Sequence, residues 1–106
     1  MINITDTEIS DVKIIVPQIY DDHRGHFFES YHQREFDEKM DKINFVQDNE
    51  SKSSFGVLRG IHFQKFPFEQ SKLVRVIKGE IQDVAIDLRI DSPTYKQYVS
   101  IILNDQ

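Results

Sequence analysis

The stretch Phe55-Gly56-Val57-Leu58-Arg59-Gly60-Ile61-His62-Phe63-Gln64 decides how the rest of the chain is interpreted. It places one histidine in the middle of an apolar run that is typical of a β-strand. Arg59 lies just upstream of His62, and a second cation, Lys72, lies downstream. An imidazole titrates near neutral pH and can act as a general base, while guanidinium and ammonium groups bind anions. The stretch therefore predicts a site that takes a proton from an anionic substrate.

Length and composition bound the possibilities. A chain of 106 residues predicts a single domain over residues 1–106 with a small core. A hydrophobic content of 39% with eight phenylalanines is enough for a globular fold. The net charge of −5, without a basic run, argues against a nucleic-acid partner, because phosphate backbones need a concentrated positive face. An anionic small ligand must therefore meet local cations.

No targeting segment is visible. The first residues lack the basic and apolar regions of a signal peptide, and no apolar run approaches the roughly 20 residues of a membrane span. The absence of cysteine excludes disulfides and thiolate metal sites. We expect a cytoplasmic protein with no membrane partner.

Short apolar and alternating segments predict a chain made mostly of strands. One short helix is expected over residues 33–40, where Glu35 and Lys39 form an i,i+4 pair. Strands are expected over residues 12–16, 27–31 and 43–49, in the run that begins at Val57, and over residues 72–77, 81–89 and 97–103.

Many short strands with turns between them predict an antiparallel barrel or sandwich. The last strand is apolar, and about six strands would leave an open edge, so the barrel would be incomplete in this chain. We expect another chain, or a longer form of this one, to complete it. The exposed apolar strand also predicts a homodimer or larger assembly.

A hairpin of residues 72–77 and 81–89, turning near Gly79, places Lys72 on the same face as Asp83 and Asp87. Two interpretations follow. The charged side chains line a cavity among small apolar residues, or they form an ordinary cross-strand surface pair.

Each candidate residue also has an ordinary structural explanation. A single strand histidine such as His62 is commonly a hydrogen-bonded core or surface residue. Arg24 fits a solvated turn, Arg59 a surface strand, and the sequence Gln47-Asp48-Asn49 the start of a loop. None of these residues identifies a site alone.

Several ordered motifs resemble those of the dTDP-4-dehydrorhamnose 3,5-epimerases of the cupin superfamily. The resemblance spans most of the chain and implies a cupin-type antiparallel jelly-roll barrel, incomplete here, with one short helix. The motifs are Asp22–Glu29 (D-x-R-G-x-F-x-E), Phe45–Ser51 (F-x-Q-D-N-x-S), Gly56–Gln64 (G-V-L-R-G-I-H-F-Q), Gln70–Leu73 (Q-x-K-L), Gly79-Glu80 with Asp83–Arg89 (G-E and D-V-A-x-D-L-R), and Ser92-Pro93-Thr94.

The resemblance implies inversion of the carbons next to the keto group of dTDP-4-dehydro-6-deoxy-glucose, in dTDP-rhamnose biosynthesis. His62 matches the base, and Lys72 matches the cation that stabilises the enolate oxygen. Asp83, from the hairpin argument, is expected to orient Lys72. The matched substrate-binding positions are Arg59 at the pyrophosphate and Arg24, Glu29, Gln47 and Asn49 at the nucleotide, with Arg24 and Glu29 reaching a neighbouring subunit's site. Asp48, in the same motif as Gln47 and Asn49, is also expected to bind substrate. No cofactor is implied.

The family continues beyond the point matched by Gln106. Its members carry a glycine-aromatic-histidine segment, a tyrosine acid on the opposite sugar face and a carboxylate behind the base. We therefore expect the isolated 106-residue chain to be inactive or nearly so. Two alternatives remain: a non-catalytic sugar-nucleotide binding module, and a metal-dependent cupin. The second conflicts with Gln64, which stands where a cupin metal site has its second histidine, since glutamine is a poor transition-metal ligand.

Overall fold

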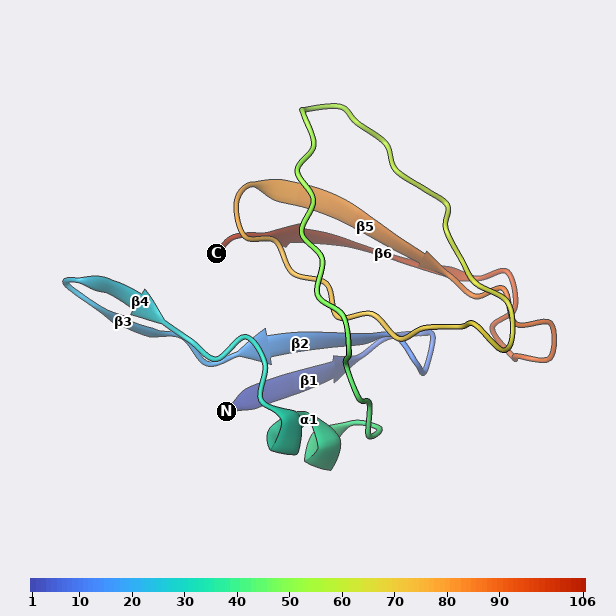
Figure 1. Ribbon diagram of the computed structural model, residues 1–106, viewed down its shortest axis with the longest axis horizontal. Coiled ribbons are helices and arrows are strands. Elements are labelled where there is room, and N and C mark those ends of the chain that lie inside the picture. The colour runs from blue at the N-terminus through green and yellow to red at the C-terminus, as the bar shows by residue number, and fades with distance from the viewer. The chain divides into compact units, whose positions relative to one another are not determined.

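The computed structural model describes all residues from Met1 to Gln106. Its contacts divide into two compact units, one formed by Met1–Lys42 with Arg75–Gln106 and the other by Ile43–Val74. The first unit carries every helix and strand, as three antiparallel pairs and one short helix (Figure 1). The predicted class, mostly strands with one helix and no closed barrel, is confirmed. That residues 1–106 form a single domain stays a prediction.

The chain starts with a strand that the sequence analysis missed. β1, Ile2–Asp6, pairs with β2, Lys13–Pro17, in antiparallel register. β2 matches the predicted strand over residues 12–16. The side chains of Ile2 and Ile9 are 3% and 2% exposed and form part of a small core. The alternation of apolar and polar residues in β1 is the signal that could have revealed it.

The only helix is α1, Gln33–Lys39, as predicted to within one residue. His32 is its N-cap, and its Nδ1 accepts a hydrogen bond from the Glu35 backbone N–H at 3.5 Å. Phe36 is buried, and its ring meets the Tyr31 ring edge-on with 4.8 Å between centroids. One apolar side chain therefore fixes the inner face of this short helix.

The second pair is a small hairpin of β3, Tyr20–Asp22, and β4, Gly25–Phe27. The strand predicted over residues 27–31 is therefore wrong in position, because pairing starts at Gly25 and ends at Phe27. Gly25 has φ 136°, a left-handed conformation that glycine adopts without steric cost. This conformation lets the chain reverse directly after Asp22.

The third pair corrects the predicted hairpin. β5, Glu80–Ile86, pairs with β6, Tyr98–Asn104, and not with residues 72–77 (orange and red in Figure 1). Gly79 lies at φ 96° just before β5 and is hydrogen-bonded to the residue that follows β6. Its N–H donates to Asp105 Oδ2 at 3.0 Å, and its carbonyl accepts from the Asp105 N–H at 3.2 Å.

The loop between β5 and β6 is organised by a buried carboxylate. Asp87 is 4% exposed and accepts hydrogen bonds from Ser92 Oγ and Thr94 Oγ1, each at 2.5 Å, and from Arg89 Nε at 2.9 Å. Arg89 also forms an ion pair with Asp11. The guanidinium and the two hydroxyls hold the Asp87 pKa well below its usual range. The interpretation that Asp87 lines a cavity with Lys72 and the alternative of an exposed surface pair are both wrong for this carboxylate, because its own loop encloses it.

The Ile43–Val74 unit contains no helix and no paired strand. Two of its backbone hydrogen bonds close turns, from the Val57 N–H to the Ser54 carbonyl and from the Phe68 N–H to the Lys65 carbonyl. The strands predicted over residues 43–49 and from Val57 are therefore wrong as paired strands. A strand needs a neighbour to satisfy its backbone, and no segment of the chain forms a ladder here.

Candidate active site

His62 and Lys72, the predicted base and its partner cation, both belong to the Ile43–Val74 unit. Both side chains are exposed. Their roles stay predictions. The sequence around them is rich in apolar residues, and no helix or strand of this chain holds them in a fixed relation.

Asp83 lies on β5, in the other unit, and is half-buried on the face that it shares with Ala85. Its partner across the strand pair is Ile101. The predicted hairpin that would have placed Asp83 beside Lys72 is absent. The orienting role of Asp83 therefore loses the geometric argument that suggested it, and it stays an untested prediction.

Arg59 is anchored within its own unit. Its Nε donates to Ser53 Oγ at 2.8 Å, and its Nη2 donates to the Lys52 carbonyl at 3.2 Å. These bonds use part of the five N–H donors of the guanidinium and restrict its orientation. The remaining donors are of the type that phosphate oxygens accept from in bidentate fashion. The anchoring is consistent with the predicted pyrophosphate contact.

The polar sequence Gln47-Asp48-Asn49 is exposed. Gln47 Nε2 donates to Asn49 Oδ1 at 3.2 Å, so the two amides stabilise each other. The remaining amide groups can still donate and accept, as recognition of a nucleobase or sugar requires. The predicted nucleotide-binding role of these residues is compatible with this arrangement.

Arg24 lies in the β3–β4 turn and pairs with Asp22, at 2.6 Å from Nη2 and 3.1 Å from Nε. The Asp22 carboxylate raises the pKa of Arg24, and the Arg24 guanidinium lowers the pKa of Asp22. Arg24 is therefore a permanent cation at an exposed hairpin tip. Glu29 is exposed, just beyond β4.

One aromatic and cationic cluster in the first unit was not predicted. The Arg75 guanidinium lies over the Phe28 ring, 5.9 Å from its centroid, and the His26 ring stacks on Phe28 at the same centroid distance. His26 and Phe28 belong to the motif that contains Arg24 and Glu29. Two aromatic rings within a charged motif are the sequence signal that could have pointed to the cluster.

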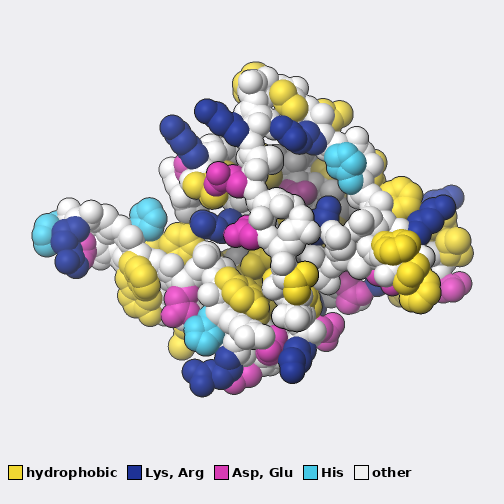
Figure 2. Space-filling view, in the orientation of Figure 1, with side chains coloured by type: hydrophobic (Ala, Val, Ile, Leu, Met, Phe, Trp, Pro, Cys, Tyr) yellow, Lys and Arg dark blue, Asp and Glu magenta, His cyan; other side chains and the backbone are white.

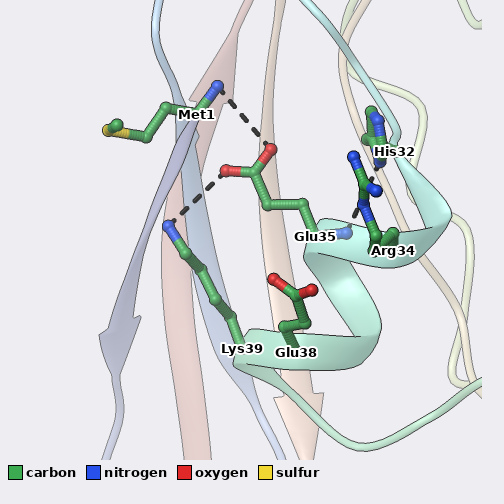
Figure 3. A pocket seen from close by; sticks show the side chains of 6 residues that line it. All are labelled: Met1, His32, Arg34, Glu35, Glu38 and Lys39. Carbon is green, nitrogen blue, oxygen red and sulfur yellow. Dashed lines mark hydrogen bonds and ion pairs between the residues drawn. The ribbon is translucent and has the colours of Figure 1, made fainter.

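The open cavity beside α1 contains none of the predicted site residues (Figure 3). Glu35 points across it, with its carboxylate 3.6 Å from the Met1 amino group and 3.5 Å from Lys39 Nζ. The same carboxylate accepts from the Ile2 N–H at 2.6 Å, and Lys39 donates to the Ile2 carbonyl at 2.6 Å. The hydrogen bond from Ile2 and the nearby positive charges lower the pKa of Glu35 against the effect of burial. These contacts hold α1 against the start of β1. The cavity is therefore a gap between two packed elements, and we do not assign a site to it.

No three or more histidine, cysteine, aspartate or glutamate side chains gather in a way that could hold a metal ion. None of the helical structure is long and apolar enough to cross a membrane.

Comparison with known proteins defines the class. The dTDP-4-dehydrorhamnose 3,5-epimerase family model matches residues 6–106. The epimerase of Shigella flexneri is 50% identical over 103 residues, which cover 96% of this chain and 57% of that protein. The chain therefore spans little more than half the length of this relative.

Two crystal structures share the backbone path. The epimerase of Bacillus anthracis, solved with TDP and pyrophosphate bound, superposes with a TM-score of 0.94 at 42% identity, covering 99% of this chain and 61% of its own. The dTDP-6-deoxy-D-glucose-3,5-epimerase of Legionella pneumophila, in complex with dTDP-4-keto-L-rhamnose, gives 0.93 at 47% identity, covering 99% and 56%.

The fold is thus that of the cupin-type sugar-nucleotide epimerases, with its sheets open in this chain. The chain belongs to the dTDP-4-dehydrorhamnose 3,5-epimerase family, of which it corresponds to the N-terminal part.

Proposed function

We propose that this chain supplies the base, the enolate-stabilising cation and the phosphate-binding arginine of a dTDP-4-dehydrorhamnose 3,5-epimerase. The observation that carries the proposal is the family match over residues 6–106, which includes His62, Lys72 and Arg59 within their motifs. The two related crystal structures, which hold TDP with pyrophosphate and a dTDP-linked keto-sugar, support the same class of substrate.

The chemistry follows from the side chains. The hydrogens on the carbons next to a ketone are acidic, so a neutral imidazole such as that of His62 can remove one of them. The electron pair then moves onto the ketone oxygen, where the Lys72 ammonium stabilises the negative charge. Reprotonation of the carbon from the opposite face completes the inversion. Arg59 binds the pyrophosphate and so positions the sugar.

We further propose that the isolated 106-residue chain does not complete this reaction, because inversion needs a proton donor on the sugar face opposite the base. Conversion of dTDP-4-dehydro-6-deoxy-glucose to its inverted product, followed by NMR, tests this, because a base alone can exchange hydrogen for deuterium without inverting the carbon. The chain alone is expected to show almost no conversion. Conversion at a rate near that of a full-length relative would contradict the expectation.

The residue roles are tested in a fusion of this chain to the part of the Shigella flexneri epimerase beyond the matched region. The fusion is expected to incorporate deuterium. His62→Ala is expected to lower the rate about 10²–10⁴-fold, and Lys72→Met about 10²–10³-fold. His32→Asn, which removes another imidazole but keeps a good helix cap, serves as the control and should leave the rate within about threefold. An active His62→Ala fusion would overturn the assignment of the base.

The two alternatives have distinct signatures. A binding module would bind dTDP tightly, and neither the chain nor the fusion would incorporate deuterium. A metal-dependent cupin would contain stoichiometric metal by elemental analysis and would lose activity on chelation. We also propose a homodimer and a cytoplasmic location, which analytical ultracentrifugation and cell fractionation test directly.

A further inference from the structure

The guanidinium of Arg59 is held at one edge only. A guanidinium is planar and offers two edges for paired hydrogen bonds, one formed by Nε with Nη2 and the other by Nη1 with Nη2. At the first edge, Nε donates to Ser53 Oγ at 2.8 Å and Nη2 donates to the Lys52 carbonyl at 3.2 Å. The Nη1 group has no hydrogen-bond partner in this chain. The two bonds therefore fix the direction in which the second edge faces.

Two other arginines use the same edge with a different kind of acceptor. Arg24 and Arg89 each donate from Nε and Nη2 to the carboxylate of the aspartate two positions earlier. A negative charge thus offsets the positive charge of each of these arginines. The acceptors at Arg59 are an uncharged hydroxyl and an uncharged carbonyl, and no carboxylate forms an ion pair with it. Arg59 is therefore oriented while its charge stays available to a ligand.

A charged arginine with one open edge is suited to a phosphate group. Figure 2 shows Lys and Arg side chains, in dark blue, at several separate places on the visible face and not in one basic patch. The chain as a whole is acidic, with a net charge of −5. Binding of an anion therefore depends on individual cations and on how each is oriented. The Nη1–Nη2 edge of Arg59 offers parallel N–H groups from which two oxygens of a phosphate can accept.

We propose that Ser53 is a positioning residue: its hydroxyl, together with the Lys52 carbonyl, holds Arg59 so that the Nη1–Nη2 edge binds the pyrophosphate of the nucleotide sugar. The inference rests on the pyrophosphate contact proposed above for Arg59, and it adds the residue that orients the guanidinium and the edge that binds. A long side chain that is already held loses less conformational freedom when its ligand binds. Because Ser53 is exposed, water competes for its hydrogen bond, and a moderate effect is expected.

The orientation itself is measured by NMR of the arginine side chains in the isotope-labelled 106-residue chain. The Arg59 Nε–H proton should exchange with water faster in Ser53→Ala, and Ser53→Thr, which keeps a hydroxyl, should restore slow exchange. Addition of inorganic pyrophosphate should shift the Nη proton signals of Arg59 more than its Nε–H signal. A larger shift at Nε–H would overturn the proposal, and so would the absence of any response of Arg59 to pyrophosphate.

The consequence for binding is measured by calorimetry with dTDP, on the fusion to the Shigella flexneri segment. Ser53→Ala should weaken dTDP binding about three- to tenfold, and Ser53→Thr should bind within about twofold of the unmodified fusion. Ser54→Ala is the matched control, because only the backbone carbonyl of Ser54 takes part in a hydrogen bond. It should change the Kd by less than about 1.5-fold. Equal effects of the two alanine substitutions would overturn the proposal.

A double-mutant cycle separates positioning of Arg59 from any other role of the Ser53 hydroxyl. Arg59→Lys keeps a positive charge but loses both guanidinium edges, so Ser53→Ala in that background should change the Kd by less than about 1.5-fold. An effect as large as in the unmodified fusion would show that the hydroxyl acts without Arg59, which overturns the positioning role alone. If Arg59→Lys binds dTDP as tightly as the unmodified fusion, the proposed pyrophosphate contact is itself wrong, and the role of Ser53 is overturned with it.

Discussion

Asp87 and Asp22 illustrate how surroundings change the role of the same local pattern. Each aspartate pairs with the arginine two positions later, Asp87 with Arg89 and Asp22 with Arg24. The Asp87 carboxylate is enclosed by its loop, whereas the side chain of Asp22 is 45% exposed at a hairpin tip. Solvent screening weakens the exposed pair, so only the enclosed one should contribute substantially to stability.

The first prediction compares these two aspartates. Asp87→Asn replaces an oxygen that accepts from arginine or hydroxyl donors with an NH2 group, and we expect the Tm to fall by about 5 °C or more. Asp22→Asn, the matched control, should change the Tm by less than about 2 °C. Thermal unfolding followed by circular dichroism measures both. Equal shifts would show that the loop does not depend on the Asp87 carboxylate.

The second prediction concerns pH. The pKa of Asp87 is lowered in the folded chain, relative to about 3.9 in an unfolded one, so its stabilisation is complete above about pH 5. That contribution is lost progressively as the pH falls below this value towards the folded-state pKa, because the unfolded chain takes up the proton first. The slope of Tm against pH between 5 and 3 should therefore be shallower in Asp87→Asn than in the unmodified chain. Glu35 and Asp22, whose pKa values are also lowered, would maintain part of the slope.

At the scale of elements, local sequence signals predicted α1, β2 and β6. The existence of β1, the position of the β3–β4 hairpin and the partner of β5 depend on pairing between segments. The helix has an i,i+4 ion pair between Glu35 and Lys39 and one buried aromatic residue, Phe36, and all three residues are close together in the sequence. β5 was correctly expected as a strand, but its partner was not. Several segments of the chain compete to pair with a given strand. The pairing of β5 with β6 therefore cannot be predicted from the few residues around either strand.

The third prediction tests the anchoring of α1. Phe36 is 4% exposed, so Phe36→Ala should lower the free energy of unfolding by about 3 kcal/mol, through lost burial and the cavity left behind. Phe66→Ala is the control, because Phe66 is 86% exposed and its removal should cost less than about 0.5 kcal/mol in the isolated chain. Urea denaturation gives both values. Similar losses would mean that Phe36 does not anchor the helix.

At the scale of the whole molecule, the two units differ in how their backbones are satisfied. The first has three strand pairs and a helix, and the second has turns. Regions with few protected hydrogen bonds open at low free-energy cost and are cleaved first by proteases.

The fourth prediction follows from this difference. Limited trypsin digestion of the 106-residue chain should cut first after Arg59 or Lys65, in the unit without strands or helices, and later after Arg89, which lies in the loop organised by the buried Asp87 carboxylate. Mass spectrometry of early fragments identifies the sites. Initial cleavage at Arg89 would contradict the assigned difference in local stability.

The sequence by itself determined the class of the chain, its single helix and several of its strands, and it suggested the candidate site residues, whose roles stay predictions. These follow from periodicity, from turn chemistry and from motifs that are contiguous along the chain. Only the tertiary structure decided that β1 exists as the partner of β2, that β5 pairs with β6, and that residues 43–74, which carry His62 and Lys72, have no ladder within this chain. The physical reason is that a strand is stabilised by hydrogen bonds to a neighbour that its own sequence does not specify.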